Sequence, residues 1–189
     1  MHSIEPYYQW QVYYDSAQDE QSPFYGKEYN YDLYSDNIYG YYIDPAWDYM
    51  GSETLYLKII YANYEDGIAI LEFIGEWNDA INNDVMTLKR NIIDNLIMEG
   101  IHKYVLIGEN VLNFHGSDDS YYEEWFEDLE EGWVCAVNFQ EHVLEEMSKY
   151  NLDSYINYGG SLQITNWRTF KPDLFCQLVE SKVMKRLTF

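Results

Sequence analysis

From residue 53 onward, hydrophobic and polar positions alternate in the patterns typical of strands and helices. Two β-rich runs, 55–61 and 68–74, flank an Asp-Gly dipeptide at 66–67, which favours a hairpin turn. These runs are therefore predicted to form an antiparallel pair. The segment 82–100 begins with Asn-Asn-Asp, carries hydrophobic residues at helical spacing and ends at a glycine, so we expect a helix there.

The rest of the chain continues this alternation. Strands are expected at 103–107 with an extension through 111–114, at 133–137 and near 155–158, and helices after residue 120, over 140–150 and from 172 to 187. The run 133–137 is almost entirely apolar, as in a strand covered on both faces. The order β-β-α-β-α-β-α-β-α predicts an α/β domain over 53–189, in which helices pack on a mixed, mostly parallel sheet.

Residues 1–52 lack any sustained hydrophobic period. They contain twelve tyrosines and nine acidic residues, and Lys27 is their one Lys or Arg. We expect an irregular N-terminal arm packed on the core, because rings such as Trp10 and Trp47 bring a large apolar area. Two alternatives are a carbohydrate-binding platform and a homodimer joined through this arm.

Composition narrows the functional classes. A chain of 189 residues with 47% hydrophobic residues is long enough for one folded domain, and its net charge of −22 repels nucleic acid and anionic membranes. The sequence has neither a membrane-length apolar run nor the features of a signal peptide, which predicts a cytoplasmic protein. Cys135 and Cys176 lie in apolar stretches and are expected to be buried thiols. No cofactor is expected.

Polar side chains concentrate in the segment 113–120, at the predicted carboxyl end of a parallel strand, where open α/β sheets tend to bind ligands. The candidate binding residues are Asn113, His115, Asp118, Asp119, Tyr121 and Trp125. Ser120, followed by Glu123, fits a capping box at the start of the next helix.

The segments 70–76, 104–107, 111–114 and 117–120 together resemble the STAS domain of bacterial anti-sigma-factor antagonists. The resemblance covers about 55–187 in element order and 70–122 in residues. It implies a hairpin start, a helix, and a strand ending in a loop where a phosphorylatable serine opens the second helix.

Ser117 is the nearest match to that serine and Ser120 the second, which makes both candidate phosphorylation sites. The family loop reads Asp-Ser-Ser/Thr-Gly, and the leading Asp and trailing Gly are missing from 116–120 here. This departure bears on the phosphoswitch more than on the fold. The whole chain also resembles uncharacterised bacterial proteins.

Other chemistries fit the sequence less well. No Gly-x-Ser-x-Gly elbow accompanies the serines, and Asp118 with Asp119 lacks the ligand spacing of a calcium loop. His115 has no ligand-like spacing with a cysteine, so no metal is expected. Glu76 and Asp79 are conceivable glycosidase carboxylates, although nothing in the sequence fixes their separation.

Twelve acidic residues and no Lys or Arg fall between 104 and 148. We expect a non-enzymatic regulatory or protein-interaction domain that recognises a basic protein partner through 113–120 and the acidic second helix, with Tyr121 or Trp125 as an anchor. Reversing Glu124 or Glu127 should then alter binding and leave stability nearly intact. The alternative is a small-molecule or carbohydrate binder, conceivably a hydrolase, whose pocket forms between the arm and the strand ends.

Overall fold

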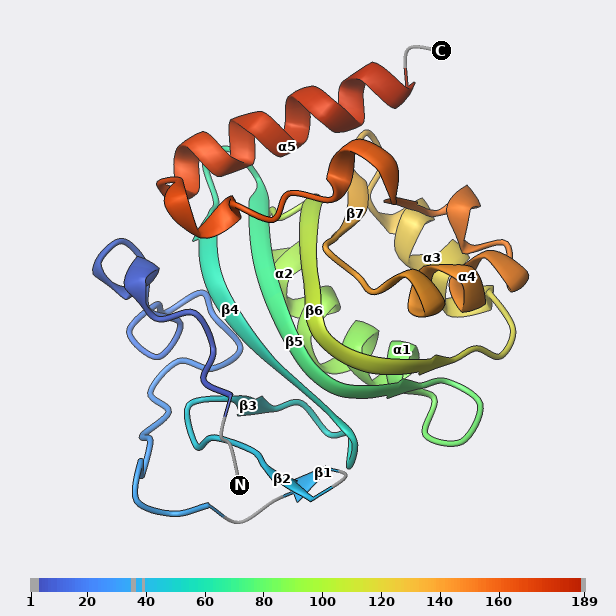
Figure 1. Ribbon diagram of the computed structural model, residues 1–189. Helices are drawn as coiled ribbons and strands as arrows, with labels where there is room; N and C mark the ends of the chain where they lie inside the picture. The colour runs from blue at the N-terminus through green and yellow to red at the C-terminus, as the bar shows by residue number, and fades with distance from the viewer. Residues whose placement is uncertain (1–3, 35–36, 39, 188–189) are drawn as a thin grey trace.

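The computed structural model describes residues 4–34, 37–38 and 40–187. Its centre is a six-stranded sheet in the order β3-β4-β5-β6-β7-β8 (Figure 1). The strands are β3 (Asp48–Tyr49), β4 (Leu55–Asn63), β5 (Ile68–Asn78), β6 (Lys103–His115), β7 (Trp133–Val137) and β8 (Ile156–Tyr158). The first two pairings are antiparallel and the other three are parallel. The predicted α/β class with a mixed sheet is therefore confirmed.

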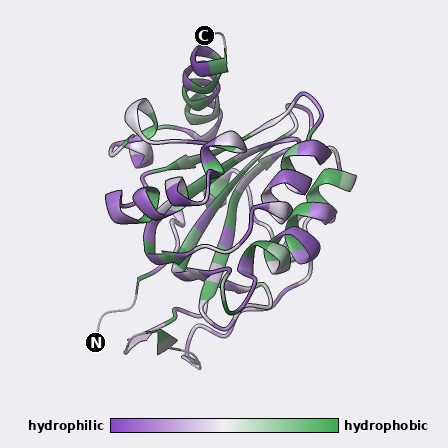
Figure 2. Ribbon diagram, turned by 90° about the vertical axis from the view of Figure 1, so that its right-hand side faces the viewer, coloured by the Kyte–Doolittle hydropathy of each residue, from purple (hydrophilic) through white to green (hydrophobic). Residues whose placement is uncertain are grey.

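Helices follow the strands in the predicted order. They are α1 (Asp84–Leu88), the π-helical turn η2 (Lys89–Ile93), α2 (Asp94–Met98), α3 (Ser120–Asp128), α4 (Glu141–Lys149) and α5 (Pro172–Leu187). The short elements are η1 (Gln9–Val12), β1 (Asn37–Ile38), β2 (Tyr41–Tyr42), η3 (Leu152–Ser154), η4 (Gly160–Leu162) and η5 (Trp167–Thr169). Viewed as in Figure 2, the strands are strongly hydrophobic, whereas the helices carry many hydrophilic positions.

Each face of the sheet buries a separate hydrophobic cluster. Side chains of α1, η2, α2, α3 and α4 pack on one face, where Phe73 and Leu106 lie. The other face, with Ile70 and Val105, packs against α5 and Trp10. Because successive residues of a strand point to opposite faces, β5, β6 and β7 supply both clusters and are buried on both sides.

Two glycines fix the ends of predicted elements. Gly67 has φ +63° in the turn of the β4–β5 hairpin, and a Cβ there would lie 2.1 Å from the His102 ring. Gly100, with φ +95°, follows the helical segment 84–98. Both positions need the backbone freedom of glycine, which explains why these boundaries were readable in the sequence.

The helical segment begins differently from the prediction. Asn83 occupies the N-cap position in a left-handed conformation, and its side chain makes no capping bond. The Asp79 carboxylate accepts the Val85 N–H instead, at 2.8 Å. The cap therefore comes from the end of β5, next to the helix in space.

The N-terminal segment, residues 1–52, is tied to the sheet. Trp10 is 2% exposed and its indole N–H donates to the Phe170 carbonyl at 3.0 Å. The Trp10 ring meets Trp167 edge-on, with centroids 5.4 Å apart. Since β3 also lies in this segment and pairs with β4, residues 1–52 contribute both a strand and core side chains.

Candidate functional site

The 113–120 segment lies where β6 passes into α3. Asn113 and His115 belong to the end of β6, and Ser120 is the first residue of α3. Ser117, Asp118 and Ser120 are exposed, whereas Asn113 and Asp119 are partly buried. The segment thus offers hydroxyl and carboxylate groups to solvent beside the carboxyl ends of the parallel strands.

Asp118 makes local hydrogen bonds in this segment, whereas Asp119 reaches a distant residue. The Asp118 carboxylate accepts the Ser120 N–H at 3.2 Å and also the Ser120 hydroxyl, and these bonds lower the pKa of Asp118. Asp119 is the N-cap residue, with no side-chain capping bond, and its carboxylate accepts the Tyr155 hydroxyl at 3.1 Å. The expected capping box with Ser120 as N-cap is therefore wrong, because the helix begins one residue earlier than that motif requires.

Two of the predicted polar residues pair with β5. The His115 Nε2 atom lies 3.7 Å from a Glu76 carboxylate oxygen, and the other Glu76 oxygen accepts the Asn78 side-chain N–H at 2.9 Å. Strand register also places Asn113 opposite Glu76. A cluster of Glu76, His115 and Asn113 thus lies at this edge of the sheet.

Asp79 is the other acid considered for glycoside hydrolysis, and both of its carboxylate oxygens accept hydrogen bonds within the fold. One carboxylate oxygen accepts the Tyr122 hydroxyl at 2.6 Å, and the other accepts the Trp77 and Val85 N–H groups. Burial raises the pKa of Asp79 to about 6, although these bonds oppose the shift. Both oxygens serve the junction of β5, α1 and α3, which leaves Asp79 poorly placed to act on a substrate.

Helix α3 differs from the expected docking helix at its aromatic positions. Trp125 is 1% exposed and packs against Tyr104 in the core, so it cannot anchor a partner at the surface. Tyr121 is partly buried, and the Arg90 guanidinium lies 5.6 Å from its ring centroid. Phe126, which the prediction did not single out, is the exposed ring of this helix at 45%.

Two acids of α3 already have cationic partners. Glu124 receives two hydrogen bonds from the Arg90 guanidinium, at 2.6 and 2.8 Å. Asp128 lies 2.6 Å from the buried Lys89 ammonium. Reversing Glu124 would therefore also break an intramolecular ion pair, and the expectation of unchanged stability applies better to the exposed Glu127.

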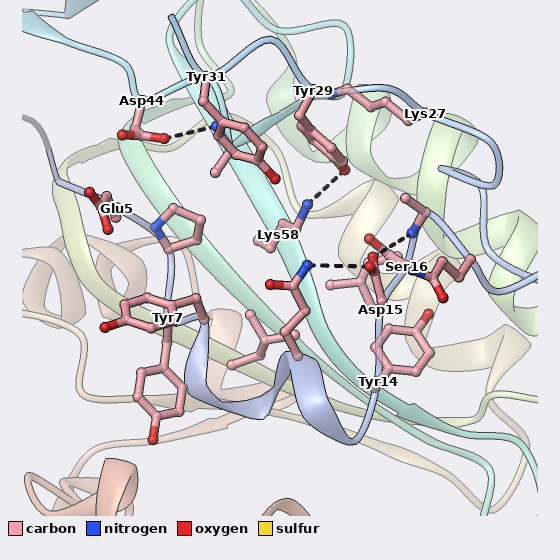
Figure 3. A pocket seen from close by; sticks show the side chains of 18 of the residues that line it. Glu5, Tyr7, Tyr14, Asp15, Ser16, Lys27, Tyr29, Tyr31, Asp44 and Lys58 are labelled. Atoms are coloured by element: carbon pink, nitrogen blue, oxygen red, sulfur yellow. Dashed lines mark hydrogen bonds between the residues drawn. The ribbon is translucent and has the colours of Figure 1, made fainter.

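A cavity of about 660 Å³ lies between the N-terminal segment and β4, remote in sequence from 113–120 (Figure 3). β3 pairs with β4 only at Tyr56 and Leu57, so the strand from Lys58 onward faces the N-terminal segment instead. The lining includes Lys58 together with Tyr7, Tyr14, Tyr29 and other tyrosines. A volume of this size suits a small-molecule ligand.

Charged groups beside this cavity form a compact network. The Asp48 carboxylate lies 2.6 Å from the Lys27 ammonium and 3.2 Å from that of Lys58, and Asp48 itself is fully buried. Lys58 donates to the Tyr29 hydroxyl at 2.7 Å and lies 4.0 Å from the ring centroid. Burial lowers the pKa of Lys58, and Asp48 opposes that shift.

The alternative prediction, a pocket between the arm and the strand ends, would place His115, Asp118 or Glu76 in that pocket. The cavity lies elsewhere, and none of these three residues lines it. The sequence did not predict a role for Lys58 or Asp48, because Lys58 lies within a run of aromatic and aliphatic residues and Asp48 stands between two aromatic neighbours. The one available signal was Lys27, the single Lys or Arg of residues 1–52, because a cation surrounded by acids in sequence favours an ion pair with one of them.

A second buried carboxylate joins the N-terminal segment to the sheet. Glu72 is 1% exposed, accepts the Tyr7 backbone N–H at 2.7 Å and lies 3.6 Å from the Arg168 guanidinium. Arg168 also pairs with Glu109 at 2.6 Å. Burial raises the pKa of Glu72 to about 7, against the effects of the Tyr7 bond and Arg168. These contacts join the N-terminal segment to β5, β6 and η5, so the role of this cluster is structural.

Both cysteines are buried free thiols, as predicted. Within residues 4–34, 37–38 and 40–187, no three His, Cys, Asp or Glu side chains come together as a metal site requires. Among the same residues, no helix is long and apolar enough to cross a bilayer. No protein-family model matches the chain, and no curated protein matches it significantly.

Proposed function

We propose that this protein is a non-enzymatic regulatory or interaction domain, similar to STAS domains, which binds a protein partner through the 113–120 segment and α3. The order of elements supports this function. A β-hairpin is followed by a helical segment, then by the parallel strand β6, an exposed loop and α3. This is the order that the family resemblance implies.

The observation that carries the proposal is the exposure of both candidate serines at the passage from β6 to α3. Ser117 lies in the loop and Ser120 opens a helix of nine residues. A phosphate on either residue would add negative charge near a helix N-terminus, beside Asp118 and Asp119. Modification would therefore change the charge of the surface that the partner contacts.

The same surface presents one large exposed ring. Two exposed acids lie near Phe126 on the helix: Glu123 is one turn earlier, and Glu127 is the next residue. An aromatic anchor surrounded by charges is a common arrangement in protein interfaces. The acids favour a partner with basic side chains, and they would speed its association at low salt.

Contacts in the segment favour binding over nucleophilic catalysis. The Ser120 hydroxyl donates to Asp118, and His115 pairs with Glu76. A Ser–His mechanism needs the serine hydroxyl bonded to the histidine, with a carboxylate behind that histidine. The observed pairs separate these groups.

A photo-crosslinking amino acid in place of Phe126, in the full chain, tests the proposal. A second protein carrying the same group at Leu174, which is similarly exposed on α5, is the matched control. We expect position 126 to capture a partner that position 174 does not. Equal capture at the two positions would contradict a specific surface on α3.

The affinity of the purified partner then tests the charges. Ser117→Glu and Glu127→Lys are each expected to weaken binding about tenfold, while Ser117→Ala and the α4 surface variant Glu145→Lys leave it unchanged. Unaltered affinity in both test variants would overturn the proposal.

A further inference from the structure

The cavity between the N-terminal segment and β4 has two ends with different charge. Lys58, Tyr29 and Asp15 lie toward one end, and Glu5 with Asp44 lies at the other (Figure 3). Tyr31 lies beside Asp44, between the two ends in this view. A ligand inside the cavity would therefore meet a mixed environment on one side and an acidic one on the other.

The positive charges of the two lysines that line the cavity are already balanced by carboxylates. Both lie within ion-pair distance of Asp48, and Asp15 also favours the charged form of Lys58. Glu5, Glu28 and Asp44 complete the acidic lining, and none of them makes an ion pair with a residue that the structure describes. The cavity thus carries carboxylates in excess of its cations.

Asp44 is the most enclosed of these acids, at 5% exposure. Its carboxylate accepts the Ala46 N–H at 2.9 Å and the Tyr34 hydroxyl at 3.3 Å. These donors are neutral, so within the described part of the chain the negative charge of Asp44 has no cationic partner. A buried carboxylate in this state favours a positively charged ligand group beside it.

The walls add a second property suited to cations. Six tyrosines line the cavity: Tyr7, Tyr8, Tyr14, Tyr29, Tyr31 and Tyr34. The faces of aromatic rings attract ammonium groups. Lys58 already uses this attraction, since its ammonium lies 4.0 Å from the Tyr29 ring centroid.

We infer that the cavity binds a small organic cation, an amine or a quaternary ammonium compound, with its positive group at the Glu5–Asp44 end. The net charge of −22 would raise the local concentration of such a ligand. An anion would meet the excess carboxylates, and a neutral sugar would leave them uncompensated. This inference is independent of the proposed partner-binding surface, because no residue of 113–120 lines the cavity.

Calorimetric titration of the full chain with choline and with spermidine tests the inference. Glucose and succinate serve as neutral and anionic probes, and salt at about 0.15 M suppresses diffuse attraction to the acidic surface. We expect one site per chain for at least one cation, with a Kd of about 1 mM or tighter. Neither neutral nor anionic probe should bind there.

Variants locate the site. Glu5→Gln and Asp44→Asn should each weaken cation binding about tenfold, whereas Glu131→Gln, an equal charge change at an exposed position outside the cavity, should leave it unchanged. Glu5 is exposed, so its variant keeps the test valid should Asp44→Asn disturb the loop. The absence of cation binding, preferential binding of glucose or succinate, or equal weakening by Glu131→Gln would each overturn the inference.

Discussion

The 113–120 segment and the N-terminal segment are both rich in polar and acidic residues, yet they use them in opposite ways. In the first, the Asp118 carboxylate bonds to Ser120, two residues away, and both are exposed. In the second, the Tyr7 hydroxyl donates to the carbonyl of Arg168, across 161 positions of sequence. The first segment therefore presents hydroxyl and carboxylate groups at the surface, whereas the second packs on the sheet and lines a cavity.

The largest expected difference between the regions concerns Trp10. Replacing it by alanine should lower the free energy of unfolding by about 4 kcal/mol, because the side chain is buried against Trp167 and Phe175 and its N–H is bonded. Urea unfolding measures this loss. Val12→Ala, on the same short helix but 83% exposed, is the control and should change stability little. Similar losses for the two variants would show that the N-terminal segment does not depend on Trp10.

The next effect is a dependence of stability on pH through Glu72. Burial raises its pKa in the folded state to about 7 from an ordinary value of 4.5, so the folded protein holds this proton more tightly than the unfolded chain. The resulting stabilisation is complete below about pH 4.5 and is lost as the pH rises through 7. In Glu72→Gln the free energy of unfolding should therefore fall less between pH 4.5 and 8 than in the wild type, by up to about 3 kcal/mol. The glutamine retains an acceptor for the Tyr7 N–H.

Unfolding curves from pH 4.5 to 8 for wild type and Glu72→Gln provide the measurement. The exposed variant Glu131→Gln controls for the general effect of removing one acid. Parallel pH profiles for wild type and Glu72→Gln would mean that Arg168 holds Glu72 ionised throughout this range.

The contrast also explains what could be read from the sequence. Gly67 and Gly100 mark element ends through their own backbone conformations, and the apolar run 133–137 marks a strand buried on both faces. These are local signals, and they predicted the hairpin, the helical segment and the α/β class. Lys58 and Asp48 acquire their roles only when β3 pairs with β4 and the segment of Lys27 and Tyr29 packs beside them. The sequence pattern does not record this arrangement.

The candidate site also combines features that local sequence predicts with features that depend on packing. The polar character of 113–120 was visible, and the structure exposes Ser117, Asp118 and Ser120 as a surface segment requires. The burial of Trp125 could not be predicted, because an aromatic residue on an acidic helix is compatible with both a surface anchor and a core contact. Its burial follows from the packing of α3 against the sheet residue Tyr104.

The smallest effect on stability is expected within 113–120 itself. Asp118→Ala removes the acceptor for the Ser120 N–H at the start of α3 and should cost about 1 kcal/mol, as is usual for bonds at helix N-termini. Since the Ser120 bonds lower the pKa of Asp118, this contribution is present at neutral pH and is lost as the pH falls through the lowered pKa. Urea unfolding at pH 7 and at pH 3 should therefore show a smaller difference between wild type and variant at the lower pH. Ser117→Ala, one residue earlier and exposed, is the control. A loss of stability for Asp118→Ala as large as that for Trp10→Ala would show that 113–120 is a structural segment like the N-terminal one. A segment with that structural role would not be free to bind a partner.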